Sequence, residues 1–443
     1  MPYENQRATG EALISLQQSK LFEEFKGRIR PPPPRSEEAL EPTAIPEAEL
    51  AINRVITIDG SLVTETLKDG FPGAEASLVQ LALVYIDLRK LKAEGPGRII
   101  PPRAFNEMDD ARTLQTVLPG RNVVRNDGLQ PRDFFRHSVF EALQGKIVQS
   151  GHETLLETFE HLVKGRHGEF RCPHDELCGN QLRPITGCGK CACERDKEIY
   201  STDQMRFHER FSEMGPNGEP HGEVMRFLEL ILLLNVLRYF VANDDAVHVL
   251  PRIAFVLDGP LAAFGQFASV VPRVKEEVRR ISEECRDRTG KDLLLFSLVK
   301  SGQFVEHFER IDFDPKLGPG GRFQARTALL PNIAYIHRNI VFRAPDAKEW
   351  GKSTYFGRAV LYKSRTGQKM VVNTAMTSDA SDDLSNTTLA AYTRLPETLG
   401  IVDRLSTYLF EGGFVPIVRA HSHAAIPLKI GGEILQSLFE DDV

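Results

Sequence analysis

The sequence lacks the features that mark secreted, membrane-spanning and strongly basic proteins. Its first eighteen residues are polar and contain no apolar stretch of the kind that a secretory signal needs. The most apolar run, 225–240, includes Arg226, Glu229, Asn235 and Arg238, which a membrane span rarely tolerates, so we expect a buried helix and no membrane contact. Basic residues are not in excess, since 55 Lys and Arg stand against 61 Asp and Glu, for a net charge of −6. A polyanion would therefore have to be held by a local patch or by a partner protein.

Cysteine is scarce, and five of the six cysteines lie within 22 residues of one another. They are Cys172, Cys178, Cys188, Cys191 and Cys193, whereas Cys285 stands apart. Such clustering favours a metal site in a reducing compartment over a disulfide framework, so we expect a cytoplasmic protein. The spacing approaches that of a zinc ribbon, in which four thiolates hold a structural Zn²⁺. We expect the spare thiol to be Cys191 or Cys193, with His174 as a possible substitute ligand.

The length of 443 residues suits one large α/β domain with insertions, or two domains. Residues 1–30 resemble an amphipathic helical arm with Leu13, Leu16, Leu21 and Phe22 on one side, and Pro31–Pro34 end it as a stiff spacer. We therefore predict an arm and linker over 1–48 and a main domain over 49–443. Gly, Pro and charged residues are frequent over 95–215, which we interpret as an insertion that carries the cysteines at 172–193.

Apolar runs and breakers predict alternating strands and helices over the main domain. Predicted strands are 55–58, 253–257, 293–299, 358–363, 368–374 and 414–418. Predicted helices are 223–240, 273–288, one near 395–408 and one that follows His423, while 78–88 fits a strand or a helix. The strand–helix–strand run over 253–299 is a βαβ unit, whose strands should be parallel. We predict an α/β fold with a mixed sheet flanked by helices, which suits an RNase H-like layered fold better than a barrel.

Two of the predicted strands are followed by Asp-Gly. Asp59 and Asp258 should lie at the carboxyl ends of their strands, the edge where open α/β sheets bind ligands, and the glycines allow a sharp turn. If the two strands are neighbours, the carboxylates approach within metal-bridging distance. A single Asp-Gly after a strand is more often an ordinary turn. Because two occur in this chain, we consider an ordinary turn and a metal site equally good interpretations.

Three further residues are candidates for the same site. Glu229 lies on a helix that is apolar nearly all round, and a buried carboxylate needs either a salt bridge, here to Arg226 or Arg238, or a metal ion. Lys300 follows the strand 293–299 and either contacts a phosphate or is solvated. We interpret the segment with His421 and His423 as extended and expect at most one of the two imidazoles to enter the site.

The ordered segments TIDGS, MRFLE, FVLDGPL, LVKS and VRAHSHAAI resemble the NurA nuclease family. The resemblance covers scattered stretches over 50–100 and 220–440, and the order of the motifs is more specific than any one of them. It implies an RNase H-like fold, Mn²⁺ or Mg²⁺ as cofactor, DNA cleavage, and a homodimer that works with a HerA-type hexameric ATPase in DNA end processing, repair or antiviral defence. It also implies metal-binding or catalytic roles for Asp59, Glu229, Asp258, Lys300 and His421, with His423 as the fallback.

These residue types define a reaction. Carboxylates and one imidazole form an oxygen-rich site for Mg²⁺ or Mn²⁺, and two such ions assist in-line displacement at a phosphodiester. Lys300 would offset charge on the phosphate in the transition state. The alternative is a non-catalytic adaptor with the same fold that docks on a DNA-translocating ATPase. An adaptor would not need Asp59, Asp258 and Glu229 together, so the sequence favours the nuclease.

Overall fold

The computed structural model describes residues 17, 19–29, 42–68, 70–90, 109–145, 148, 150–164, 169–174, 178–191, 193, 197–318, 321–344, 349–407 and 413–437. The chain divides into two compact units, Met1–Leu40 and Glu41–Val443. The boundary lies before the predicted residue 48, because strand β1 (Thr43–Ala44) pairs with β11 (Thr327–Leu329) of the second unit. Glu47 strengthens this attachment by accepting hydrogen bonds from Arg326 and Arg365.

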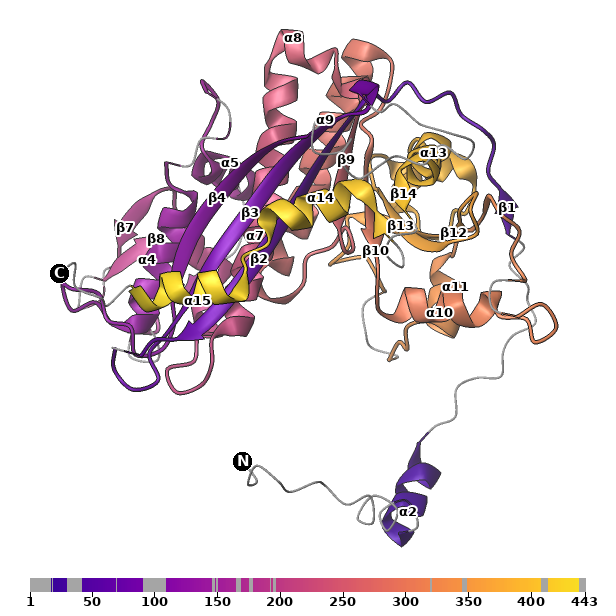
Figure 1. Ribbon diagram of the computed structural model, residues 1–443. Helices are drawn as coiled ribbons and strands as arrows, with labels where there is room; N and C mark the ends of the chain where they lie inside the picture. The colour runs from indigo at the N-terminus through magenta and orange to yellow at the C-terminus, as the bar shows by residue number, and fades with distance from the viewer. Residues whose placement is uncertain are drawn as a thin grey trace. The chain divides into compact units, whose positions relative to one another are not determined.

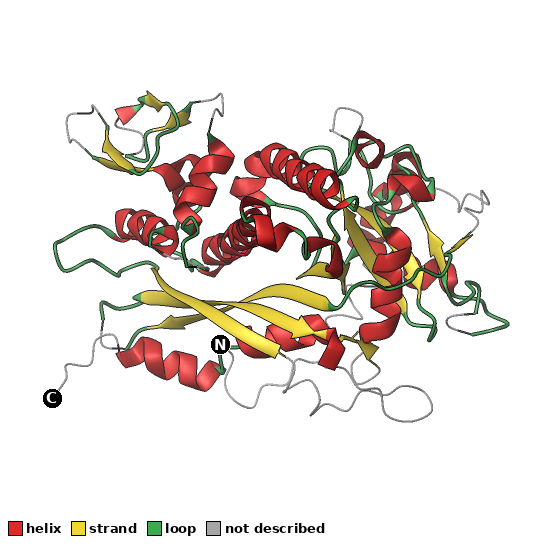
Figure 2. Ribbon diagram, turned by 90° about the horizontal axis from the view of Figure 1, so that it is seen from above, coloured by secondary structure: helices red, strands yellow, loops and turns green. Residues whose placement is uncertain are grey.

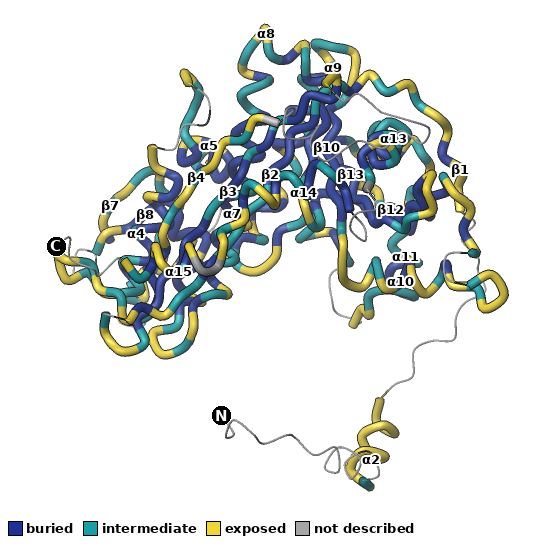
Figure 3. Tube along the Cα trace, viewed as in Figure 1, coloured by how far each residue is buried: buried dark blue, intermediate teal, exposed yellow. Residues whose placement is uncertain are grey.

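The first unit contains helix α2 (Lys20–Arg28). The Ser19 hydroxyl caps this helix by accepting a hydrogen bond from the backbone N–H of Phe22 at 3.2 Å. No residue of α2 is buried, and Figure 3 shows the helix coloured mostly as exposed. Leu21 and Phe25 are among its exposed apolar side chains. Leu13, Leu16 and Pro31–Pro34 of the predicted arm lie outside the described residues.

The second unit is built on a mixed sheet of nine described strands (Figure 1). Its order is β1-β11-β12-β13-β10-β9-β2-β3-β4, in which β9 lies parallel to both β2 and β10 and the other pairs are antiparallel. The remaining strands are β2 (Arg54–Thr66), β3 (Glu75–Asp87), β4 (Asp109–Pro119), β9 (Ile253–Asp258), β10 (Leu295–Val299), β12 (Gly357–Lys363) and β13 (Lys369–Ala375). This arrangement confirms the predicted α/β fold with a large mixed sheet.

Helices cover both faces of the sheet, as Figure 2 shows. One face carries α4 (Pro131–Leu143), α5 (Leu155–Val163), α7 (Gly218–Ala242) and α9 (Val271–Thr289). The other carries α13 (Leu395–Leu405), α14 (Val415–Ala424) and, over β2 and β3, α15 (Leu428–Gln436). Alternation along β2 supplies both cores, since Val55 packs toward α13 and α14 while Ile56 and Ile58 pack toward α7. Shorter helices are α8 (Asp244–Val247), α10 (Gln303–Asp312), α11 (Ile333–Asn339) and α12 (Asp379–Asp382).

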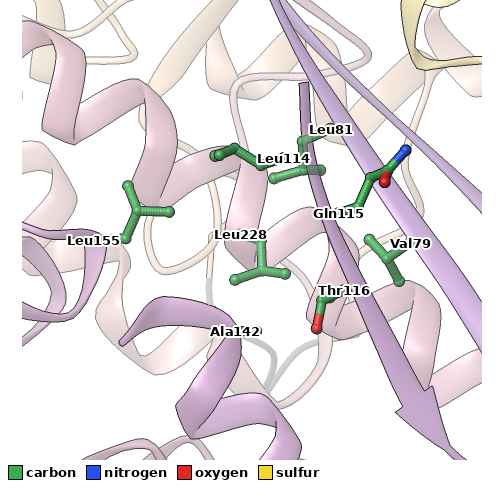
Figure 4. A pocket seen from close by; sticks show the side chains of 8 residues that line it. All are labelled: Val79, Leu81, Leu114, Gln115, Thr116, Ala142, Leu155 and Leu228. Carbon is green, nitrogen blue, oxygen red and sulfur yellow. The ribbon is translucent and has the colours of Figure 1, made fainter. Parts of the chain in front are cut away.

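Helix α7 is the central support of the first face. Its apolar residues are buried almost all round, which confirms the buried helix predicted from the sequence. Among the described helices, α7 included, none combines the length and the continuous apolarity that a membrane crossing requires. Figure 4 shows the small apolar gap that Leu228 of α7 shares with Leu81 of β3 and Leu114 of β4.

The predicted βαβ unit is confirmed. Strands β9 and β10 are parallel neighbours, and α9 connects them. Helix α9 has a proline in its first turn and ends at Gly290, whose φ of 77° is the left-handed conformation that closes helices. The unit fixes the direction of β9 and therefore the edge at which Asp258 emerges.

Two sequence predictions were wrong. Much of 95–215 is not an insertion, because β4 is the edge strand of the main sheet and α4 and α5 bury Phe135 and Phe159 in its core. The segment 414–418 is not a strand, because β15 (Gly413–Phe414), paired with β14 (Ser406–Thr407), ends where α14 begins. The β-branched residues of 415–418 suggested a strand, but Pro416 occupies the first turn of a helix, where proline is well tolerated.

Candidate active site

Asp59 and Asp258 lie side by side on neighbouring parallel strands. The last paired residues of β2 and β9 are Ile58 and Leu257, and each aspartate is the next residue along its strand. Only Asp258 ends its strand as predicted, because β2 continues through Asp59 and Gly60 to Thr66. Asp59 therefore lies inside a long strand, at the level where its parallel neighbour stops.

The two glycines that follow these aspartates have different roles. Gly259 makes the expected sharp turn, with φ of 78°, and its N–H donates to Asp258 Oδ1 at 2.9 Å. Gly60 makes no turn, because it lies within β2. Its role is to leave space, since a Cβ at Gly60 would lie 2.4 Å from Oε1 of Glu229. The missing side chain is therefore the space that lets Glu229 of α7 approach the backbone of β2.

This packing brings carboxylates to β2 from two sides. Successive residues of a strand point to opposite faces, so Asp59 points away from the face on which Glu229 contacts Gly60. Since β9 ends beside Asp59, no described strand pairs with β2 on that side beyond Ile58. Groups from both faces can meet around this open edge.

Burial and repulsion from neighbouring carboxylates disfavour the charged forms of Glu229 and Asp59. The pKa of Glu229 is raised to about 8, first by burial and then by the charge of Asp59. The pKa of Asp59 is also raised, first by burial and then by Asp258, while His421 opposes the rise. Arg238 does not pair with Glu229 as considered from the sequence, because it binds Glu153 and Glu277 instead. A cation at this edge would relieve the repulsion.

Lys300 and His421 complete the group. Lys300 follows β10, the other neighbour of β9, and its Nζ donates to Asp258 Oδ2 at 2.8 Å. His421 lies on α14, and its Nδ1 is 3.1 Å from Asp59 Oδ2. The two histidines lie on a helix and not on an extended segment, and two residues along a helix correspond to about 200° of rotation. His421 is the one that contacts Asp59.

The sequence analysis missed Gln80, which positions α14. Its amide Nε2 donates to the carbonyl oxygens of His423 at 2.9 Å and Ala424 at 3.2 Å, at the end of the helix that carries His421. The available signal was a single amide within the otherwise apolar strand β3. The role of Gly60 was also predicted wrongly, because Asp-Gly suggested a turn, whereas this glycine permits the close approach of Glu229 to β2.

The donor set fits hard divalent cations in its chemistry. Carboxylate oxygens are the preferred ligands of Mg²⁺ and Mn²⁺, and an imidazole suits Mn²⁺. The carboxylates do not converge on one point, because among the described residues only a group of cysteines has all its ligand atoms within 4.8 Å of one another. Oxygens on opposite sides of a single Mg²⁺ would lie about 4.2 Å apart. The acids would therefore have to move closer together to hold a single ion.

The cysteine group consists of Cys172, Cys178, Cys191 and Cys193. Each of two small hairpins supplies two thiols near its tip. The hairpins are β5 (Phe170–Arg171) with β6 (Gln181–Leu182), and β7 (Cys188–Lys190) with β8 (Glu198–Tyr200). The sulfurs of Cys178 and Cys191 are 3.6 Å apart, close to the roughly 3.8 Å edge of a tetrahedron with Zn–S bonds of about 2.3 Å. The geometry can hold one tetrahedral metal ion.

Our expectation that Cys191 or Cys193 is the spare thiol was wrong. Cys188 is exposed and lies outside the group. The regular spacing of Cys188 and Cys191 suggested a pair, but Cys188 opens strand β7 while Cys191 follows its end. Burial tends to raise the pKa of Cys191, yet the amide of Asn180 and the neighbouring thiols lower it to about 7, so this sulfur readily becomes a thiolate.

Comparisons with known proteins give one likeness to report. No family model matches the chain, and no curated protein matches it. Among solved structures, the chain is similar to the NurA nuclease from Sulfolobus solfataricus, with 11% sequence identity, a TM-score of 0.36, and coverage of 97% of this chain and 96% of that chain. The likeness is confined to the course of the chain, so the chemistry of the site has to be argued from its residues.

Proposed function

We propose that this protein is a metal-dependent deoxyribonuclease. The observation that carries the proposal is the placement of Asp59 beside Asp258, with Glu229 packed against Gly60, the residue after Asp59. Burial and the charges of Asp59 and Asp258 raise the pKa of Glu229, and burial and Asp258 raise the pKa of Asp59. Such a grouping has no evident structural use, since an apolar residue at the buried position of Glu229 would stabilise the fold better. The preference for DNA follows from the motif resemblance to NurA nucleases.

In this proposal Asp59, Glu229, Asp258 and His421 hold the divalent ions, Mn²⁺ or Mg²⁺. The bound ions would supply Lewis acidity at the phosphodiester and lower the pKa of water. Lys300 pairs with Asp258. It would be free to contact the substrate phosphate once that carboxylate held a cation. His421 keeps the Asp59 carboxylate oriented through its contact with Oδ2.

The direct test uses the purified chain and end-labelled linear DNA. We expect cleavage with Mn²⁺, less with Mg²⁺, and none after the divalent ion is removed. Cleavage that persists without divalent ions would rule out the proposed chemistry. If no DNA is cleaved with either ion, the adaptor hypothesis is favoured instead.

The four-cysteine group is proposed to hold a structural Zn²⁺. The core beneath it is small, formed mainly by Phe170, Ile199 and the cysteines themselves, so the hairpins bury too little apolar surface to fold without a metal. A site closed by four thiolates leaves no position for substrate, so its role is structural.

We expect a single Zn²⁺ per chain in protein purified without chelator. The variant Cys172→Ser should lose most of this zinc and make 170–200 sensitive to protease, because Cys172 is a buried member of the group. Cys188→Ser is the matched control, since its exposed thiol lies outside the group, and it should keep both zinc and protease resistance. Elemental analysis checks the result, and equal zinc loss in the two variants would contradict the assignment.

We further propose that the protein forms a homodimer that acts with a HerA-type ring ATPase, as the motif resemblance implies. A chain with net charge −6 should bind DNA weakly at physiological salt, and a translocase that feeds DNA to the site would remove that difficulty. The exposed apolar residues of α2 make it a candidate docking element. Co-purification with the ATPase that is unchanged after deletion of residues 1–30 would exclude the arm as the contact.

A further inference from the structure

Four aromatic side chains, one exposed and three half-buried, form a continuous row. The ring centroids of Phe264 and Tyr355 are 5.6 Å apart, those of Tyr355 and Trp350 are 4.3 Å apart, and those of Trp350 and Phe304 are 5.1 Å apart. We call this row the aromatic ladder. In the described part of the chain, its rings belong to none of the apolar cores, and Phe264 is 42% exposed.

The ladder is attached to the same loops that carry the acidic site. Phe264 ends the segment that begins at Asp258, and six residues span at most about 20 Å. The backbone of this segment is bonded to the neighbourhood of Tyr355, with Ala263 N–H donating to Thr354 O at 2.8 Å and Phe356 N–H donating to Leu261 O at 2.9 Å. The position of Phe264 relative to Asp258 is thus fixed by hydrogen bonds.

The other end of the ladder follows the lysine of the site. Phe304 lies in the first turn of α10, which begins three residues after Lys300. A second cation, Lys352, lies between Trp350 and Tyr355 in the sequence and is 74% exposed, with Glu349 at 3.9 Å as a weak surface partner. Lysines therefore lie close in sequence to Phe304 and to Trp350, and one of them, Lys300, contacts the carboxylate of Asp258.

We propose that the aromatic ladder binds the unpaired bases of single-stranded DNA and guides that strand to the acidic site. Surfaces that bind single strands combine cations for the backbone with aromatic rings on which bases stack. The bases of a duplex are already stacked on one another, so they are not free to use such rings. This inference rests on the proposed nuclease function for its substrate, but binding can be measured without cleavage.

Trp350 provides the measurement, because it is the only tryptophan in the chain. The full chain carrying Asp258→Asn is titrated with a short oligothymidylate in buffer without chelator, so that the cysteine-bound metal is kept. We expect saturable quenching of the Trp350 fluorescence by the single strand and less quenching by a hairpin duplex of the same length.

Phe264→Ala should raise the Kd for the oligothymidylate at least about fivefold, since stacking contributes about 1–3 kcal/mol per base. Phe264→Tyr should restore binding because it keeps the ring. Phe264→Leu should not, and it separates stacking from packing because it keeps an apolar side chain. Phe71→Ala removes another exposed phenylalanine, in the turn between β2 and β3, and should leave the Kd unchanged.

The outcomes separate this inference from the nuclease proposal. If the wild-type chain cleaves DNA but neither Phe264→Ala nor Phe264→Leu weakens binding or quenching, the ladder has no role in binding and the inference is overturned. Equal quenching by duplex and single strand overturns the preference for unpaired bases. If Phe264-dependent quenching occurs but no ion supports cleavage, the ladder stands and the nuclease proposal fails.

Discussion

Asp258→Asn is expected to reduce metal-dependent DNA cleavage at least about a hundredfold, the usual cost of removing a group that stabilises transition-state charge. Asparagine keeps the shape of the side chain but loses the negative charge that holds a divalent ion. The fold should tolerate the change, because Asp258 is exposed and its contact with Lys300 is a surface ion pair worth at most about 1 kcal/mol. Asp59→Asn should inactivate the protein to a similar degree.

The measurement is the initial rate of cleavage of labelled linear DNA in saturating Mn²⁺, together with thermal unfolding of each variant. Asp287→Asn is the matched control, because Asp287 is an exposed carboxylate on α9 outside the site, and it should retain the wild-type rate. A wild-type cleavage rate in Asp258→Asn or Asp59→Asn would contradict the assignment of that residue as a metal ligand.

Gly60→Ala is expected to inactivate the protein almost as completely as loss of Glu229 itself. The added methyl group would lie 2.4 Å from Glu229 Oε1, 2.9 Å from Met225 Cγ and 3.0 Å from Leu81 Cδ2. Glu229 has to turn away from β2, and the crowding should cost about 1–3 kcal/mol of stability. Gly222→Ala, a substitution within α7 itself, is the control: its Cβ would meet Leu62 only at an ordinary 3.9 Å, so the cleavage rate should hold and the stability should not fall.

Glu229→Gln distinguishes displacement from loss of charge. Burial raises the pKa of Glu229 to about 8, so at neutral pH without metal the fold already holds a largely uncharged side chain. Glutamine should therefore leave the melting temperature close to that of the wild type while abolishing cleavage. Unfolding of this variant would instead make Glu229 a structural residue, and an active Gly60→Ala would show that its approach to β2 is dispensable.

Sequence patterns predicted the elements of the sheet better than their limits. Regular apolar runs identified β9, α9 and β10, because a βαβ unit is encoded by local periodicity. The predicted end of β2 was wrong, because the sequence does not distinguish a glycine that makes room for a distant side chain, as Gly60 does, from a glycine that makes a turn. The strand predicted over 414–418 was wrong, because Pro416 is typical of the first turn of a helix whereas the β-branched residues around it favour a strand.

The candidate site followed the same division. Asp59 and Asp258 were expected to approach one another if their two strands were neighbours, and β2 and β9 are parallel neighbours. Gln80 and the aromatic ladder could not be predicted in this way, since each joins segments separated by many residues and by no repeating pattern. Similarly, the spacing of the cysteines indicated a metal site, but only the pairing of the two hairpins separates Cys188 from the other four.

Helix α14 has a consequence for biosynthesis. Its His421 contacts Asp59 across 362 residues of sequence, and Gln80 holds the end of the same helix. A ribosome has made all three acids long before it reaches this helix, so a nascent chain can assemble the acidic edge but lacks its imidazole. The proposed nuclease would therefore stay incomplete near the nucleic acids of the translation machinery until α14 has emerged.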